Sequence, residues 1–424
     1  MTTSVASKSL AAKVRRRGRF DARHTLWDES KLSRVRNCGR VVQRNGCGVT
    51  VKVSDGAAGY GNLQTCGSVW ACPVCSAKIA AQRQGDIERA LTAWHGGAGG
   101  GDFGRVALVT LTMRHRKGQS LASLWAALSE SWNLVVSGAG WTDDQRVYGT
   151  LLPGAEYKSG PLKGQLRAAK VRIPVIRVVE VTEGVKGWHV HIHALLLLPA
   201  AADDAVVAAL GGRMFDRWAA ALKDRGLSAL RRVRQPDGTF KDLGVDARLL
   251  HGDPSAALGD YFVKATYSGS YEVARTDMKS AHYGNRTPFA ILADIVESGD
   301  ADDLDTWLEY ERASKGKRQI TWSRGLRALL LPADEVVELT DEEIAEQDCG
   351  GDEIAEIGRD LWSVIVARRA DWRILKAFER STHNGYRLLW VYADMAALES
   401  AAQWARLLAE PDPLRRQLQT KEPS

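Results

Sequence analysis

The sequence predicts an α+β protein: an antiparallel sheet with flanking helices, preceded by a cysteine-rich module and followed by a small α-rich C-terminal module. Two observations lead to this prediction. Strand-like runs alternate with amphipathic segments in the order strand, helix, hairpin, helix, which favours an antiparallel sheet carrying helices on one face. Five of the six cysteines lie between Cys38 and Cys75, ahead of the first strand-like run.

The first half of the sheet is predicted from residue types and spacing. Apolar residues at helical spacing indicate a helix over 77–95, and a glycine-rich loop follows over 96–104. The β-branched run at 106–112 suits a central strand, and 119–136 has helical periodicity. Two strand-like runs, 173–182 and 188–198, are separated by a turn containing Gly184 and Gly187, which indicates a β-hairpin.

The second half continues with helices and a further strand pair. Alanine, valine and leucine periodicity predicts a helix over 201–225, and the turn Pro236-Asp237-Gly238 suggests a strand pair within 229–250. We expect further helices at 255–266, at 288–297 after the cap-like Thr287-Pro288, and at 303–314. An acidic block at 334–356 has the composition of a linker or a solvated helix face.

Composition limits the class of protein. A chain of 424 residues with 45% hydrophobic content suggests two or three globular domains rather than a disordered, collagen-like or coiled-coil chain. The apolar runs are far shorter than the roughly 20 residues that a membrane span needs. The first twenty residues are arginine-rich and have no apolar core, so they do not resemble a secretory signal. We therefore expect a cytoplasmic protein.

The net charge is concentrated at the N-terminus. Residues 1–36 carry ten Lys or Arg and three acids, an excess equal to the charge of +7 of the whole chain. A basic arm before a neutral body is typical of contact with nucleic-acid phosphates, although a solvated tail has the same composition. A second basic stretch lies at 315–318. The candidate DNA-binding residues are Arg15, Arg16, Arg17, Arg19, Lys317 and Arg318.

The cysteine cluster predicts a structural zinc site. Cys72 and Cys75 form a Cys-x-x-Cys pair that one tetrahedral cation can bind, and Cys66 lies close before them. Cytoplasmic redox conditions disfavour disulfides, and a redox pair or buried thiols are the remaining alternatives. Cys38 and Cys47 compete to be the fourth ligand. We favour Cys38, because Cys47 lies between two glycines and has the pattern of a turn. A shell of four thiolates is closed to substrate.

The histidine cluster predicts a second metal site. His189, His191 and His193 alternate along one strand, so their imidazoles share one face of the sheet while Val190 and Ile192 face the core. Imidazoles in this arrangement suit a divalent metal with open coordination positions.

A carboxylate on the preceding strand can complete this site. A tight turn at 185–186 places Glu180 opposite His191, whereas a shifted turn would bring Glu183 there instead. We favour Glu180, because a carboxylate between Val179 and Val181 needs a partner, whereas Glu183 borders the turn and can be solvated.

A possible nucleophile lies downstream of the hairpin. On the helix expected at 255–266, the Tyr261 phenol and the Lys264 ammonium share one face at i, i+3 spacing. A nearby cation lowers the pKa of a phenol and can hold a phosphate. Tyr-x-x-Lys occurs by chance in many helices, and it indicates a nucleophile only in combination with the histidine strand.

The order of these motifs resembles the replication initiators of rolling-circle plasmids, in the HUH (His–hydrophobic–His) endonuclease superfamily, and is most similar to the actinobacterial plasmid branch. The resemblance covers roughly residues 35–330. The matching segments are Cys38-Gly39-Arg40, Cys66 to Cys75 with Lys78-Ile79, Val109 to Thr112, Glu180 to Thr182, Gly187 to His193, Tyr261 to Lys264, Thr287-Pro288-Phe289 and Lys317 to Leu326.

The resemblance implies an HUH-like fold and a mechanism of nicking and joining. These enzymes nick one strand at the plasmid's double-strand origin; a tyrosine attacks the scissile phosphate and stays attached to the 5′ end, and the free 3′ hydroxyl primes synthesis. By motif, Tyr261 would be the nucleophile, with Lys264 supporting the phosphate or phenolate charge. His191 and His193 would bind Mg²⁺ or Mn²⁺, with Glu180 and with His189 as a third ligand or a neighbouring group. A host helicase and a DNA polymerase are expected partners.

The resemblance also assigns parts of the chain. We expect a basic N-terminal arm at 1–36, a Cys-rich zinc-binding module at 37–95, an HUH nicking and joining catalytic domain at 96–333 and a C-terminal module of unknown role at 334–424. One position departs from the pattern: some related initiators carry a Glu four residues before the tyrosine, where this chain has Ala257. Asp260, Tyr267 or Glu272 are the alternatives for that role.

Other functions remain open at this point. A relaxase or a single-tyrosine transposase belongs to the same superfamily, but the Cys module and the segments after Tyr261 favour the replication branch. A non-catalytic zinc-finger DNA-binding regulator would explain the cysteines and the basic arm. It would leave the histidine strand and Tyr261 without a role. A metal store is poorly supported by one short cluster.

Overall fold

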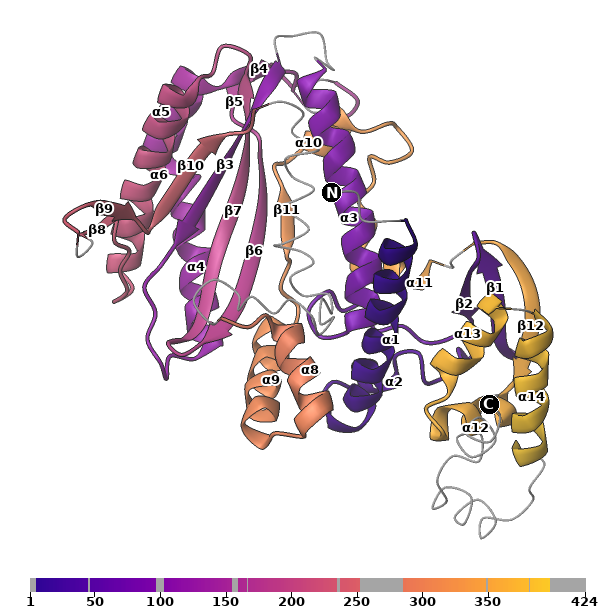
Figure 1. Ribbon diagram of the computed structural model, residues 1–424. Coiled ribbons are helices and arrows are strands. Elements are labelled where there is room, and N and C mark those ends of the chain that lie inside the picture. Colours follow the sequence, from indigo (N-terminus) through magenta and orange to yellow (C-terminus); the bar gives the residue numbers. More distant parts are fainter. Residues whose placement is uncertain are drawn as a thin grey trace. The chain divides into compact units, whose positions relative to one another are not determined.

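The computed structural model describes residues 5–44, 46–96, 103–154, 159–165, 167–234, 237–251, 285–347, 350–380 and 382–396. The chain divides into two compact units that are not consecutive in sequence (Figure 1). Unit 1 comprises the described residues of Met1–Gly18 and Val69–Thr340, and unit 2 those of Arg19–Ser68 and Asp341–Ser424. Within the described residues no helix is long and apolar enough to cross a membrane.

Unit 1 is built on a five-stranded antiparallel sheet with the strand order β10-β3-β7-β6-β11. Its strands are β3 (Phe103–Thr112), β6 (Val175–Gly184), β7 (Gly187–Pro199), β10 (Val245–Leu249) and β11 (Ile320–Trp322). The central strand β7 is buried from Val190 to Leu198, as its valine and leucine run predicts. The prediction of an α+β protein with an antiparallel sheet, and of the hairpin β6–β7, is confirmed.

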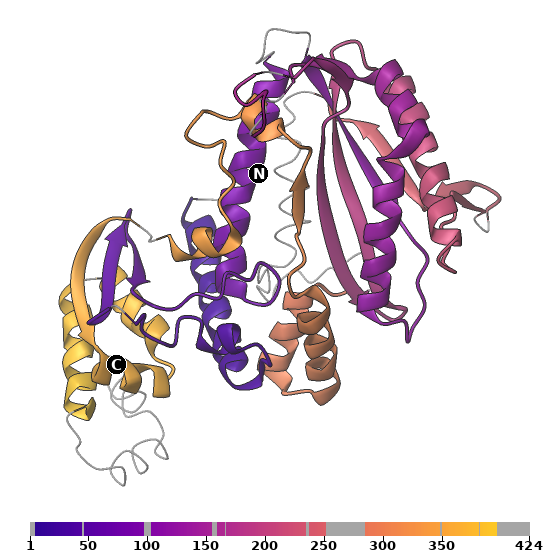
Figure 2. The same cartoon turned by 180° about the vertical axis from the view of Figure 1, so that it is seen from behind.

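Helices lie on both faces of this sheet, which corrects the expectation that they share one face (Figures 1 and 2). On one face, α3 (Pro73–His95) packs Leu91 and Trp94 onto Leu195 and Leu197 of β7. The opposite face is occupied by α4 (Leu121–Val135) and α6 (Asp204–Lys223). Gly211 of α6 lies so close to β10 that an added β-carbon would come within 2.3 Å of the Ala247 β-carbon.

The remaining helices of unit 1 are α5 (Gly138–Tyr148), α8 (Pro288–Ser298), α9 (Ala301–Ser314) and α10 (Leu326–Leu330). The sequence did not predict α5 and α10, whereas α8 begins at the predicted cap. The Thr287 hydroxyl caps α8 by accepting from the Ala290 backbone N–H, with Pro288 at the first helical position. The helices predicted at 77–95, 119–136, 201–225, 288–297 and 303–314 are confirmed to within a few residues. The helix expected at 255–266 lies outside the described residues.

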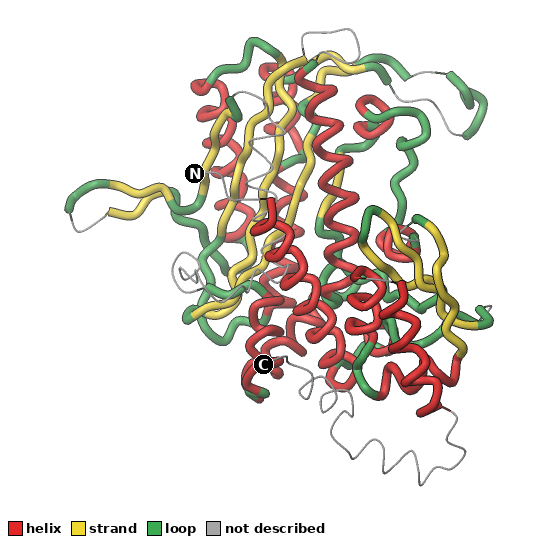
Figure 3. Tube along the Cα trace, turned by 45° about the vertical axis from the view of Figure 1, so that its right-hand side comes forward, coloured by secondary structure: helices red, strands yellow, loops and turns green. Residues whose placement is uncertain are grey.

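Two short strand pairs complete unit 1. Strands β4 (Thr150–Leu152) and β5 (Lys170–Arg172) pair with each other, as do β8 (Arg232–Arg234) and β9 (Phe240–Asp242). Figure 3 shows β8 and β9 as a hairpin that projects from the main sheet. The strand pair predicted within 229–250 is therefore present, and the chain continues from it into β10 at the sheet edge.

Unit 2 contains strands that the sequence reading missed. A three-stranded antiparallel sheet has the order β12-β1-β2, formed by β1 (Gly48–Ser54), β2 (Ala57–Gly61) and β12 (Asp352–Gly358). Strand β12 lies inside the acidic block, which is therefore not simply a linker or a helix face. Its acids, Asp352, Glu353 and Glu356, are exposed, and of its apolar residues only Ile357 is fully buried.

The helices of unit 2 include α2 (Ser33–Asn37), α11 (Asp341–Glu346), α12 (Arg359–Ala367), α13 (Asp371–Arg380) and α14 (Thr382–Ala396). Of these, α12, α13 and α14 pack against the small sheet. The core packs Val49 and Val51 of β1 against Trp362 of α12 and Phe378 of α13. Helix α1 (Val5–Glu29) adds Phe20 to this core. Within the basic arm, residues 5–29 therefore form a helix, and its Phe20 is buried in the core.

A buried ion cluster joins the two sequence halves of unit 2. The Asp371 carboxylate accepts from the Arg23 guanidinium at 2.6 Å, and it lies 2.7 Å from Nε2 of His24. Burial opposes ionisation of Asp371, but the hydrogen bond from His24 and the charge of Arg23 outweigh burial and lower its pKa. Gly39 has φ +62°, and a β-carbon there would overlap the Arg23 guanidinium, so glycine leaves room for the cluster.

Replacing Asp371 by Ala should strongly destabilise unit 2. The Asp371 side chain is 0% exposed, and removing one partner of a buried ion pair costs about 3–5 kcal/mol. Urea unfolding followed by tryptophan fluorescence measures the effect. The control is Asp360→Ala, an exposed acid in the first turn of α12, which should change the free energy of unfolding by about 0.5 kcal/mol. Equal shifts in the two variants would contradict this role of the cluster.

Candidate metal centres

Two groups of side chains among the described residues could hold a metal ion. One is Cys38, Cys66, Cys72 and Cys75, and the other is Glu180, His191 and His193. In each group the ligand atoms lie within 4.8 Å of one another. Both groups were predicted from the sequence.

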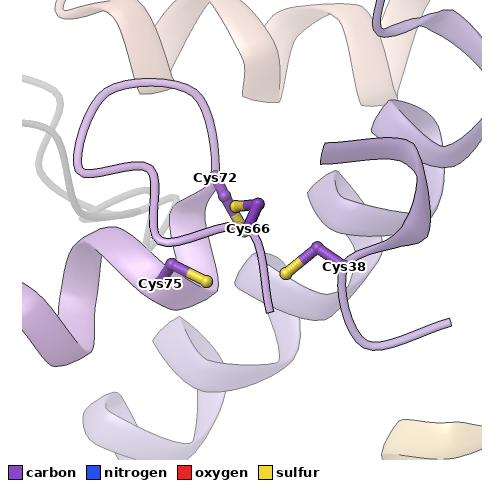
Figure 4. Close-up of side chains that lie close together, drawn as sticks. All are labelled: Cys38, Cys66, Cys72 and Cys75. Atoms are coloured by element: carbon purple, nitrogen blue, oxygen red, sulfur yellow. The ribbon is translucent and has the colours of Figure 1, made fainter. Parts of the chain in front are cut away.

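The four cysteines are buried and turn their sulfurs toward a common space (Figure 4). Cys72 is the N-cap of α3 and Cys75 lies in its first turn, where the helix dipole favours thiolates. Cys38 follows α2, and its carbonyl accepts from the Trp27 indole at 2.9 Å. The Ser68 backbone N–H donates to Cys66 Sγ at 3.4 Å.

The donor set decides between the two candidates for the fourth ligand. Cys38 belongs to the group, whereas Cys47 is exposed and outside it. Cys349 lies outside the described residues. Four buried thiols within 4.8 Å of one another fit a closed, structural metal site better than a site for substrate.

The second group is created by the register of one hairpin. Glu180 of β6 pairs with His191 of β7, as the tight turn predicts. Glu180 Oε2 lies 2.8 Å from His191 Nε2 and 2.9 Å from His193 Nε2. These side chains share the face that α3 covers further along the strands, at Leu195 and Leu197. The site therefore lies where the cover of that face by α3 ends.

The electrostatics of this group favour a cation. Burial opposes ionisation of Glu180, but the charge of His191 and hydrogen bonds from both histidines outweigh it and lower the pKa of the carboxyl. Burial, only partly offset by the hydrogen bond to Glu180, lowers the pKa of His193. An ionised carboxylate beside a neutral imidazole is the protonation state that metal ligands require.

Hydrogen bonding also orients the ligands. His193 Nδ1 lies 3.0 Å from Thr110 Oγ1 on β3, so this hydroxyl can accept the Nδ1 proton when Nε2 is free to bind a cation. His191 Nδ1 is buried and has no hydrogen-bond partner among the described residues. Two imidazoles and one carboxylate, held on rigid strands, fit a divalent cation with open positions.

His189 lies beside this group rather than in it. Its ring centroid is 4.9 Å from that of His191, and it stacks on His115 at 4.9 Å with an interplanar angle of 22°. Burial and the charges of His191 and His115 lower the pKa of His189 to about 3. Sequence reasoning missed His115; the signal was its position just after β3, the strand that pairs with β7.

Glu183, the alternative to Glu180, has a different partner. Its carboxylate accepts from the Arg286 guanidinium at 3.2 Å, and its backbone pairs with that of Arg286. Arg286 also binds Asp294 of α8 and Asp303 of α9. The expectation that Glu183 is merely solvated is therefore wrong, since it helps to attach these two helices to the end of the hairpin.

Of the other sequence-predicted site residues, those that the structure describes belong to neither group. Lys317 and Arg318 are exposed between α9 and β11, where the Lys317 carbonyl accepts from the Trp70 indole at 2.7 Å. Arg16, Arg17 and Arg19 lie on α1, and the Arg15 side chain is not described. The positions Ala257, Asp260, Tyr261, Lys264, Tyr267 and Glu272 lie outside the described residues.

Comparison with curated proteins identifies the family. The chain is 31% identical over 357 residues to "Protein rep" of Streptomyces lividans, covering 76% of both chains. The chain belongs to this Rep family. A shorter match, 29% over 165 residues, covers 35% of this Rep chain and 34% of "Neomycin resistance protein" of Streptomyces cyanogenus. No protein-family model and no solved structure matches the chain.

The thiol group of this Rep protein should bind one metal ion. Cys72→Ser removes a ligand at the start of α3 and should abolish binding of that ion, because a structural metal site needs all four ligands. Metal content per purified, dialysed chain, measured by mass spectrometry, gives the result. Cys47→Ser is the matched control and should keep the ion. Full retention in Cys72→Ser would refute the site.

The Glu180 group should bind Mn²⁺ independently of the thiols. Glu180→Gln should weaken Mn²⁺ binding by at least about tenfold, since it removes the anionic ligand while keeping its size. Glu183→Gln changes the same residue type on the same strand and should leave the affinity unchanged. Electron paramagnetic resonance titration of free Mn²⁺ measures both, and equal affinities would show that Glu180 is not a ligand.

Proposed function

We propose that this Rep protein initiates rolling-circle replication of a plasmid as an HUH endonuclease. It would nick one DNA strand at the double-strand origin and later rejoin strands. The single observation that supports this most is the Glu180–His191–His193 group on an antiparallel hairpin of a Rep family chain. The spacing His191-Ile192-His193 is that of the His–hydrophobic–His motif.

The residues of the group have defined roles in this proposal. Glu180, His191 and His193 would hold Mg²⁺ or Mn²⁺, and His189 would support them from the adjacent position. Such an ion supplies Lewis-acid polarisation of a non-bridging phosphate oxygen. Thr110 fixes the orientation of His193, and the β6–β7 register fixes the position of Glu180.

Tyr261 is proposed as the nucleophile. Its phenolic oxygen would lose its proton and attack the scissile phosphorus, while the bond from phosphorus to the 3′ oxygen breaks. The products would be a 5′-phosphotyrosine and a free 3′ hydroxyl that takes up a proton and primes synthesis. Lys264 would stabilise charge on the phenolate or the phosphate. Joining is the reverse attack by a 3′ hydroxyl on the phosphotyrosine.

The rest of the chain has supporting roles. Zn²⁺ at the four cysteines would stabilise the segment 37–95, and residues 96–333 would form the catalytic domain. Origin DNA would be contacted by Arg15, Arg16, Arg17, Arg19, Lys317 and Arg318. No role is assigned to residues 334–424. A host helicase and polymerase would continue replication in the cytoplasm, where the plasmid lies.

The proposal predicts a covalent adduct that depends on both metal and Tyr261. Supercoiled plasmid carrying the origin, incubated with the protein and Mn²⁺, should yield open circles and a protein–5′-DNA adduct that survives denaturant. EDTA or Tyr261→Phe should abolish both products, and Tyr267→Phe is the matched control.

Other outcomes discriminate between the alternatives. Nicking that survives Tyr261→Phe but not Tyr267→Phe would move the nucleophile. Origin binding without any nicking would favour a zinc-dependent DNA-binding regulator, which leaves the Glu180 group without a role. Nicking at a transfer origin or a transposon end, but not at the replication origin, would favour a relaxase or a transposase.

A further inference from the structure

Four exposed cations gather at one end of the main sheet, beside the Glu180 group. Arg114, Arg116 and Lys117 follow directly after β3, and Lys186 lies in the β6–β7 turn. We call these four residues the basic rim. They are outside both the N-terminal basic arm and the basic stretch at 315–318. Three of them are neighbours in the sequence, and the fold adds Lys186 to them.

The rim is held in place by backbone contacts. The Arg114 N–H donates to the Ser228 carbonyl at 2.8 Å, and the Arg116 N–H donates to Gln119 Oε1 at 2.7 Å. Nδ1 of His115 lies 3.1 Å from the Lys186 carbonyl, so the loop and the turn are joined. Gly187 has φ +82°, and a β-carbon there would approach Lys117 Cα to 3.3 Å, which is why this turn needs glycine.

The charges of the rim are not neutralised locally. Within the described part of the chain, none of the four side chains forms an ion pair with a carboxylate, in contrast to Arg286 nearby, which binds three. Four like charges on two adjoining loops raise the local potential and attract a polyanion. A purely solvated rim would not require the loop to be fixed against the turn.

The rim is connected to the metal group by a row of imidazoles. His115, from the rim loop, stacks on His189, and His189 contacts His191. At about 3.3 Å per residue along β7, Gly187 lies roughly 13 Å from His191. A strand that runs from the Glu180 group along β7 toward the β6–β7 turn would therefore reach the rim within a few nucleotides.

We propose that the basic rim binds the phosphate backbone of a single DNA strand next to the phosphodiester that is cut. This inference rests on the proposed function. Lys and Arg contacts to phosphates position a strand without reading its sequence. A specific duplex interface buries about 1,000 Å² or more of protein, which is more than two short loops offer, so the rim is assigned to one strand.

The test reverses two rim charges and compares a matched variant. Arg116→Glu/Lys117→Glu should weaken binding of a 20-nucleotide single strand by at least about tenfold near 0.15 M salt. The slope of log K against log salt should fall by about 1.4, because each lost phosphate contact on a single strand contributes about 0.7. Lys170→Glu/Arg172→Glu, an equal charge change on exposed β5 at the other end of β6, should leave binding near wild type.

Several outcomes would contradict the proposal that the rim binds a single strand. An equal loss of single-strand affinity in both charge-reversal variants would show that only net charge matters. A loss of affinity for duplex DNA alone would show that the rim binds duplex rather than a single strand. Arg116→Gln/Lys117→Gln and a Mn²⁺ titration check folding: affinity for Mn²⁺ should stay unchanged while strand affinity falls. Binding is measured without added Mg²⁺ or Mn²⁺. Rim-dependent binding without nicking in Mn²⁺ would then refute only the nickase. Nicking by the wild type together with normal binding by the rim variant would refute only the rim.

Discussion

The pairing of β6 with β7 is the interaction on which the candidate active site depends. A shift of one residue would turn Glu180 to the opposite face of the sheet, away from His191 and His193. The register is fixed at one end by the Gly187 turn and along its length by the buried run from Ala194 to Leu198. The apolar half of the hairpin therefore positions the polar half.

The polar half conflicts with the stability of an apolar sheet. Three ionisable groups lie on the face where, a few residues further, Leu195 and Leu197 pack under α3. Glu180 is mostly buried and relies on two imidazoles to remain ionised. A buried carboxylate with this arrangement adds little to folding, and a functional explanation is more economical than a structural one. The same face carries the row of imidazoles toward the basic rim.

The cysteine group solves a different problem. The segment 62–72 has almost no regular secondary structure, yet two of its residues, Cys66 and Cys72, are buried. The segment also buries Leu63, Val69 and Trp70, and a metal that binds only the folded arrangement would stabilise it further. Starting α3 at Cys72 then ties the thiol group to the helix that covers the sheet.

The sequence by itself determined the elements whose signals are local. Periodicity located α3, α4, α6, α8 and α9, and the Cys-x-x-Cys and alternating histidines located both candidate metal groups. The tight turn was sufficient to place Glu180 opposite His191, because strand alternation has a fixed period. Tertiary structure alone decided what depends on contacts between distant segments. It paired β12 with β1, buried Arg23 with Asp371, and brought His115 and Lys186 together, since none of these contacts leaves a pattern in neighbouring residues.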